Sequence, residues 1–270
     1  MKIFNKLFII FFIPLAIFSW GDKGHKKITE LAFKMLPAEI GFTEALKKEI
    51  VEHSVDPDYR KKEDPSEPNK HFIDIDFYKE FLDGQMIKSH DSLLTIYPDS
   101  IVTKMGMLPW ATLNTFDKLV GAFKSKDIGK ITLYVSDLAH YVGDGHQPLH
   151  TTLNYNGQLT SQKGIHFRYE IEMFDKNINV FDKKFLELKP VYVNNKLDYI
   201  FDYITESNSF VDIILSADKF AYKKSKNVFD DEYYRLLWFR AKYLTIDQVN
   251  SSAFALASLI YTAWLDSGKP

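Results

Sequence analysis

Cysteine is absent from the 270 residues of the sequence. Its absence excludes a disulfide framework, a cysteine nucleophile and a cysteine-ligated zinc site, so a bound metal would need His, Asp, Glu or the chain terminus as ligands. An excess of one charge is also lacking, because 34 Lys and Arg face 36 Asp and Glu, which gives a formal net charge of −2. This balance excludes a strongly basic nucleic-acid coat protein, although it is compatible with an enzyme that binds nucleic acid transiently.

Strand-length runs in which apolar and polar residues alternate are scarce, and the sequence has no repeats, low-complexity tracts or domain linker. Apolar residues instead recur at helical spacing, as at Ile28, Leu31 and Met35. Such spacing predicts helices over residues 103–123, 128–142, 193–219, 231–243 and 252–264. Turn-forming residues predict loops over residues 56–70 and 151–164. We therefore expect an all-α fold with a single domain over residues 20–270.

Residues 1–19 have the pattern of an export signal. Two lysines are followed by an apolar run of 12 residues from Leu7 to Phe18. A membrane-spanning helix needs about 20 such residues, so a cleaved signal is favoured over the alternative of a membrane anchor. Cleavage after Ser19 would make Trp20 the first residue of the mature chain. We expect the mature protein to be periplasmic or extracellular.

Histidine is the residue type that carries the chemical signal. His140 and Asp144 are four residues apart, His166 and Glu170 repeat this spacing, and His150 lies between the two pairs. On a helix, residues four apart lie on one face. A single pair of this kind is common on solvated helices. Two pairs with a third histidine between them favour a metal site over structural histidines, because imidazole is a frequent zinc ligand.

Four segments place these and further histidines and acids in a defined order. They are Trp20-Gly-Asp-Lys-Gly-His25, Asn69-Lys-His71-Phe-Ile-Asp74, His140-Tyr-Val-Gly-Asp144-Gly-His-Gln-Pro-Leu-His150 and Gly164-Ile-His166-Phe-Arg-Tyr-Glu170. In this order they resemble the trizinc phosphodiesterases, which include the secreted single-strand-specific nucleases of fungi and plants and the bacterial zinc-dependent phospholipases C. The resemblance extends to about residue 176 and implies a mostly helical domain around a trizinc cleft.

The resemblance also implies a set of ligands for three zinc ions. The first zinc would be held by His71, His140, Asp144 and an acid of the 56–58 loop. The second would be held by His150, His166 and Glu170. The third would be held by the amino nitrogen and carbonyl of Trp20 and by His25, with Asp144 bridging two metals. Because an α-amino group has a pKa near ~8, zinc can displace its proton.

Three further positions have open interpretations. The loop acid is Asp58 or Asp56, and we favour Asp58 because Pro57-Asp58-Tyr59 resembles the phospholipase pattern. Arg60 resembles the arginine that holds phosphate in the nucleases, although its offset from the acid differs, and the alternative is a surface arginine. Asp74 could orient a ligand imidazole or the attacking water, or it could cap a helix.

The resemblance divides between two substrate classes. The expected mature start, Trp-Gly-x-x-Gly-His, resembles the nucleases, whereas Glu170 and the 57–59 segment resemble the phospholipases. Tyr59, Tyr155 and Phe167 could stack on a base or contact a lipid headgroup, although core packing is the default expectation.

We expect a zinc-dependent hydrolase of phosphodiester bonds that is a nuclease preferring single-stranded DNA or RNA. Phospholipid cleavage is the alternative, and a non-enzymatic zinc-binding protein is the second alternative. The expected partner is the nucleic acid or phospholipid substrate, and no stable protein partner is implied.

Overall fold

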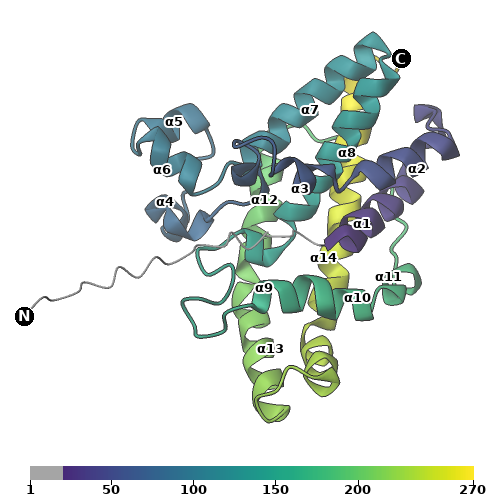
Figure 1. Ribbon diagram of the computed structural model, residues 1–270. Helices are drawn as coiled ribbons and strands as arrows, with labels where there is room; N and C mark the ends of the chain where they lie inside the picture. Colours follow the sequence, from purple (N-terminus) through teal and green to yellow (C-terminus); the bar gives the residue numbers. More distant parts are fainter. Residues whose placement is uncertain (1–20) are drawn as a thin grey trace, which may run out of the picture.

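A computed structural model describes residues 21–270, which contain helices and no strands (Figure 1). The predicted all-α class is therefore confirmed. The predicted export signal and Trp20 lie outside the described residues. Among the helices of residues 21–270, none is both long and apolar enough to cross a membrane.

The amino-terminal part combines two regular helices with several short ones. Its elements are α1 (Gly21–Met35), η1 (Ala38–Ile40), α2 (Glu44–His53), α3 (Asp56–Arg60), η2 (Pro68–His71), η3 (Ile75–Phe77), α4 (Lys79–Leu82), α5 (His90–Leu94) and α6 (Asp99–Lys104). In Figure 1, α4, α5 and α6 form a small group to one side of the larger helices.

The middle and carboxyl-terminal parts contain the long helices. Their elements are α7 (Leu108–Ser125), α8 (Ile128–Gly145), η4 (Pro148–His150), α9 (Ile165–Phe167), the π-helical η5 (Arg168–Met173), α10 (Phe174–Lys176), α11 (Asn179–Lys183), α12 (Lys196–Ser209), α13 (Val211–Lys224) and α14 (Asp231–Asp266).

Two helices organise the packing. The long α14 passes through the middle of the molecule and packs against α1, α7, α8 and α13 (Figure 1). Helix α8, whose carboxyl-terminal part is buried, packs against α2 and α7 as well as α14. Its first turn is capped by the Asp127 side chain, which accepts a hydrogen bond from the backbone N–H of Lys130. The buried apolar side chains of the helices form one core cluster, and α8 carries polar residues through it.

The structure corrects several predicted helix boundaries. Residues 231–243 and 252–264 belong to one helix, α14, because the residues between them include neither Gly nor Pro and several are buried, including Thr245 and Val249. Residues 193–219 instead divide at Phe210 into α12 and α13. Residues 56–70 are not wholly irregular, since α3 and the start of η2 fall there.

The predicted helix over residues 103–123 begins later than expected. Gly106 has a φ of 99°, and a Cβ atom at this position would lie 2.1 Å from the backbone oxygen of Phe72. Only glycine adopts this conformation with a neighbouring backbone so close. The chain turns here between α6 and α7, and the contact sets the η2 segment beside the start of α7.

Candidate metal centre

Helix α8 brings two predicted ligands into the interior. His140 and Asp144 are both fully buried, with the His140 Nε2 3.4 Å from the Asp144 Oδ2. From α1, the ring of His25 stacks on the ring of His140 at a centroid distance of 3.9 Å. The His25 Nε2 lies 3.5 Å from the Asp144 Oδ1. The close approach of α1 depends on Gly143, because a Cβ there would lie 2.8 Å from the His25 Nδ1.

A second group forms around the other side of His140. The Asp58 Oδ1 lies 3.6 Å from both the His71 Nδ1 and the His140 Nε2. Asp56, the alternative loop acid, is only partly buried and pairs with His53 at 2.7 Å instead. The two aspartates are two residues apart on α3 and point to different sides of the helix. The structure therefore brings Asp58, and not Asp56, to the buried histidines.

The third group combines His150 on η4 with His166 and Glu170. The His166 Nε2 lies 2.5 Å from the Glu170 Oε2 and 3.0 Å from the His150 Nε2. Glu170 lies in η5, a short π-helix of the kind that is often found at functional sites. All three side chains are buried.

These groups adjoin one another. In each group the possible ligand atoms lie within 4.8 Å of one another, and His140 belongs to two groups. The Asp144 carboxylate also lies 3.0 Å from the His71 Nδ1 and 3.7 Å from the His150 Nδ1. The structure thus brings together all eight predicted metal ligands that it describes. Trp20, the ninth, lies outside the described residues.

Backbone carbonyls orient two of the imidazoles. The His140 Nδ1 lies 2.8 Å from the Ser54 oxygen, and the His150 Nδ1 lies 2.6 Å from the His71 oxygen. Since a carbonyl can only accept, each Nδ1 carries the proton and each Nε2 presents a lone pair. The two Nε2 atoms face the His71 Nδ1 and the His166 Nε2, each at 3.0 Å. This arrangement of lone pairs is the one that a metal ion requires.

The protonation of the imidazoles also suits metal binding. Burial, with a contribution from His140, lowers the pKa of His25 well below its ordinary value. Burial likewise lowers the pKa of His71 well below, and that of His150 below, the ordinary value. Neutral imidazole is the form that binds metal, so these side chains are ready to act as ligands near pH 7.

The buried carboxylates show whether the residues of the three groups suit a metal ion. Both oxygens of Asp144 and of Glu170, and the Oδ2 of Asp58, are buried and accept no well-directed hydrogen bond from residues 21–270, although the Glu170 Oε2 has the His166 Nε2 at 2.5 Å as a close ion-pair partner. Burial, reinforced by Asp58, raises the pKa of Asp144 well above its ordinary value. A buried carboxylate without donors is costly unless a cation compensates it. The donor set therefore fits metal ions, and the three groups could hold them.

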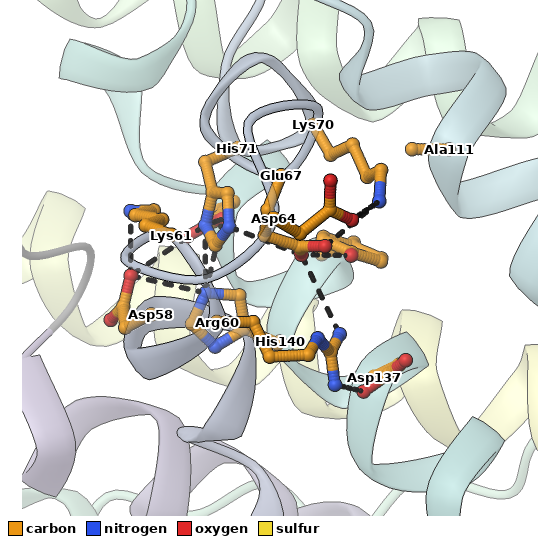
Figure 2. Close-up of polar contacts among 12 residues, drawn as sticks. Asp58, Arg60, Lys61, Asp64, Glu67, Lys70, His71, Ala111, Asp137 and His140 are labelled. Atoms are coloured by element: carbon orange, nitrogen blue, oxygen red, sulfur yellow. Dashed lines mark hydrogen bonds and ion pairs between the residues drawn. The ribbon is translucent and has the colours of Figure 1, made fainter.

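The side chains of Arg60 and Lys61 extend in different directions, Arg60 toward Asp137 and Lys61 toward Asp58 (Figure 2). The Arg60 guanidinium pairs with Asp137 at 2.8 Å and lies 3.5 Å from Glu67. The Lys61 ammonium lies 2.6 Å from the Asp58 Oδ1 and is largely buried. The guanidinium of Arg60, which the sequence suggested as the phosphate-holding cation, is thus paired with two acids. Lys61 is instead the cation that contacts Asp58, a candidate metal ligand.

Asp74 follows His71 by three residues and belongs to none of the three groups. The preceding residue, Ile73, donates a backbone hydrogen bond to the His150 oxygen at 2.9 Å. Burial, with the nearby charge of Asp76, raises the pKa of Asp74 to about 7. A carboxyl group of this kind can exchange a proton near neutral pH.

The structure corrects the default expectation for three aromatic residues. Tyr59, Tyr155 and Phe167 are 47%, 37% and 50% exposed, so none of them is a core residue. The Tyr155 ring lies 6.2 Å from the His166 ring, and Phe167 directly follows His166. Tyr59 adjoins Asp58 in sequence and donates a hydrogen bond to Asp22. Exposed aromatic side chains therefore flank two of the metal groups.

Family models and curated proteins identify no relative of this chain. No protein-family model matches the chain, and a search of curated proteins finds no significant match.

Sequence reasoning missed Lys61 and Glu67. Both carried a detectable signal, because Lys61 follows Asp58 by three residues and Glu67 precedes His71 by four, which are helical contact spacings.

Proposed function

We propose that the protein is a metal-dependent phosphodiesterase, with zinc as its metal. The observation that carries the proposal is the shared use of ligands, with His140 in two of the three groups and Asp144 within 3.7 Å of four imidazoles. Isolated structural metal sites use separate, closed ligand sets. A shared set holds cations close together, as enzymes that cleave phosphate esters do.

Zinc fits the donor chemistry. The groups offer imidazole nitrogens and carboxylate oxygens, and the chain has no thiolates. Bound together, such ions would lower the pKa of a shared water to about 7 and neutralise charge on a phosphoryl group. The His150 group supplies only three protein ligands, which is typical of catalytic rather than structural zinc.

The protein residues have distinct roles in this proposal. Asp144 adjoins all three groups and would help to hold the ions bound there. Lys61, at the Asp58 end of the centre, contributes positive charge for the phosphoryl oxygens. Asp74, with its raised pKa, accepts a proton from the attacking water.

A single-stranded nucleic acid is the proposed substrate class. Tyr155 and Phe167 are exposed beside the His166 group, where unpaired bases could stack on them. Bases within a duplex are not free to stack in this way. Phospholipid cleavage is the second candidate, because the acid of the His166 group is Glu170, as in the phospholipases that the sequence resembles. The pattern of residues 1–19 further supports export.

Metal analysis and hydrolysis assays on the same preparation test the proposal. Elemental analysis after dialysis should find more than two zinc ions per chain. The protein should hydrolyse bis-(p-nitrophenyl) phosphate, and a chelator should abolish the activity. Single-stranded DNA and RNA should be cleaved faster than duplex DNA. Cleavage of phosphatidylcholine alone would support the phospholipase, and bound zinc without any hydrolysis would contradict the enzyme.

A further inference from the structure

A buried carboxylate lies on the side of His71 that faces away from the metal groups (Figure 2). Glu67 is 1% exposed, and its Oε1 lies 3.4 Å from the His71 Nε2, one helical turn apart in sequence. On the opposite side of the ring, the His71 Nδ1 lies 3.0 Å from both the His140 Nε2 and the Asp144 Oδ2. The imidazole thus stands between Glu67 and the metal groups.

His71 differs in this respect from His140 and His150. Each of those two rings donates an N–H to a backbone carbonyl. A backbone carbonyl is neutral, and every residue has one. The His71 Nε2 instead lies 3.4 Å from the charged Glu67 carboxylate, an ion-pair contact without the direction of a full hydrogen bond in this structure. When one ring nitrogen of a histidine donates its N–H to a carboxylate, the tautomer of the ring is fixed. The other ring nitrogen then becomes a stronger electron donor than it is when the N–H is donated to a neutral carbonyl.

Other side chains hold the Glu67 carboxylate in place. Its Oε1 accepts a hydrogen bond of 2.5 Å from the Tyr141 hydroxyl, and its Oε2 pairs with Lys70 at 2.8 Å. Arg60 approaches the Oε1 at 3.5 Å while pairing with Asp137 at 2.8 Å. Tyr141 and Asp137 belong to α8, the helix that carries His140. These contacts tie the carboxylate to the helix at the middle of the metal centre.

We propose that Glu67 is a positioning residue of the metal centre, which holds His71 in the tautomer that presents Nδ1 to the Asp58 group. Tyr141, Lys70 and Arg60 anchor Glu67 in this position, and Asp137 in turn holds Arg60. This assigns Arg60 a role behind the ligand rather than at the substrate. The inference rests on the proposed metal site, but it does not depend on which phosphodiester is cleaved.

Glu67→Gln tests the inference because it keeps the size of the side chain and removes its charge. Glu63→Gln, the same change at an exposed position of the same segment, is the matched control. Metal affinity is measured by competition with a fluorescent zinc chelator. Glu67→Gln should weaken one ion by 10- to 100-fold, as is typical when the partner of a ligand histidine is lost. The remaining ions and the control should keep the affinities of the parent protein.

The tautomer provides a second readout that a structural role alone would not change. In the metal-free parent protein, nitrogen NMR of the histidine rings should show the His71 proton on Nε2, and Glu67→Gln should shift protonation toward Nδ1. The visible absorption of the cobalt-substituted protein should also change in Glu67→Gln and not in Glu63→Gln.

Unchanged affinities and an unchanged tautomer in Glu67→Gln would overturn the inference, as would a lower melting temperature with unchanged affinities. If Glu67→Gln does not fold, Tyr141→Phe decides, because it removes a donor to Glu67 and keeps the carboxylate. Weakening of the same ion supports the inference, and parent-like binding overturns it. A parent protein that binds no metal contradicts the proposed function instead.

Discussion

Two halves of the candidate metal centre are built in different ways. His25, Asp58, His71, His140 and Asp144 form what we call the distributed half, because α1, α3, η2 and α8 each contribute to it. His150, His166 and Glu170 form the local half, which comes from residues 150–170 alone. The distributed half shares His140 between two groups, whereas the local half contains a single group.

The difference in construction has an energetic consequence. Burial and Asp58 raise the pKa of Asp144, so its charge destabilises the metal-free protein. Although burial alone would raise the pKa of Glu170, His166 and His150 lower it below its ordinary value. The charge of Glu170 therefore stabilises the metal-free protein at neutral pH. The distributed half would therefore gain more from bound cations than the local half, which is partly compensated by its own histidines.

The largest expected effect is that of Asp144→Asn. Because Asp144 adjoins four imidazoles, the loss of its charge should reduce the metal content by more than one ion per chain and the hydrolysis rate by about a thousandfold, or about 4 kcal/mol. The metal-free variant should melt at a higher temperature than the metal-free parent, because a buried charge without donors is removed. Elemental analysis and thermal unfolding measure the two effects, and parent-like metal content would remove Asp144 from its bridging role.

Glu170→Gln should affect only the local half. We expect the loss of one zinc ion and a smaller loss of activity than in Asp144→Asn. The metal-free variant should melt at a lower temperature than the metal-free parent above about pH 5, because the ionised form of Glu170 is favoured in the folded state. Glu170→Asp keeps the charge and should retain more activity. If both halves lose metal in Glu170→Gln, the division into two halves is wrong.

Gly143→Ala should affect the distributed half through packing alone. The added Cβ would lie 2.8 Å from the His25 Nδ1, so the His25 ring must shift and the affinity for one ion should fall. Gly121→Ala on α7 is the matched control, because no atom outside its immediate helix lies within 4 Å of the added Cβ. The control should bind metal normally and be stabilised by about 0.5–1 kcal/mol. Chelator competition and thermal unfolding distinguish the two variants.

The smallest expected effect concerns the segment that joins the halves. Asp74 follows His71 by three residues, and its neighbour Ile73 contacts His150. As a proton acceptor with a pKa of about 7, Asp74 must be ionised, so activity should fall as the pH drops through 7. Asp74→Asn should remove this acidic limb of the pH–rate profile along with part of the activity. Asp76→Asn, which removes a nearby charge, should move the limb to lower pH. If the acidic limb of the pH–rate profile is unchanged in Asp74→Asn, the limb reports the titration of another residue.

The comparison also separates what local patterns could predict from what they could not. The pairs His140 with Asp144 and His166 with Glu170 follow from helical periodicity, and so does the all-α class. Each depends on residues within one turn of each other. The choice of Asp58 over Asp56 instead depends on which side of α3 meets the buried histidines, and residue spacing does not contain that information.

Tertiary contacts decided the remaining features. The resemblance implied that eight described ligands belong together, seven of them from the four ordered motifs and Asp58 from the 56–58 loop. The sharing of His140, the turning of Arg60 toward Asp137 and the exposure of Tyr155 each depend on segments that meet across the core. Local sequence determines which atoms can bind a metal. Helix packing determines which of them converge, because burial and charge pairing act between residues that are far apart in the chain.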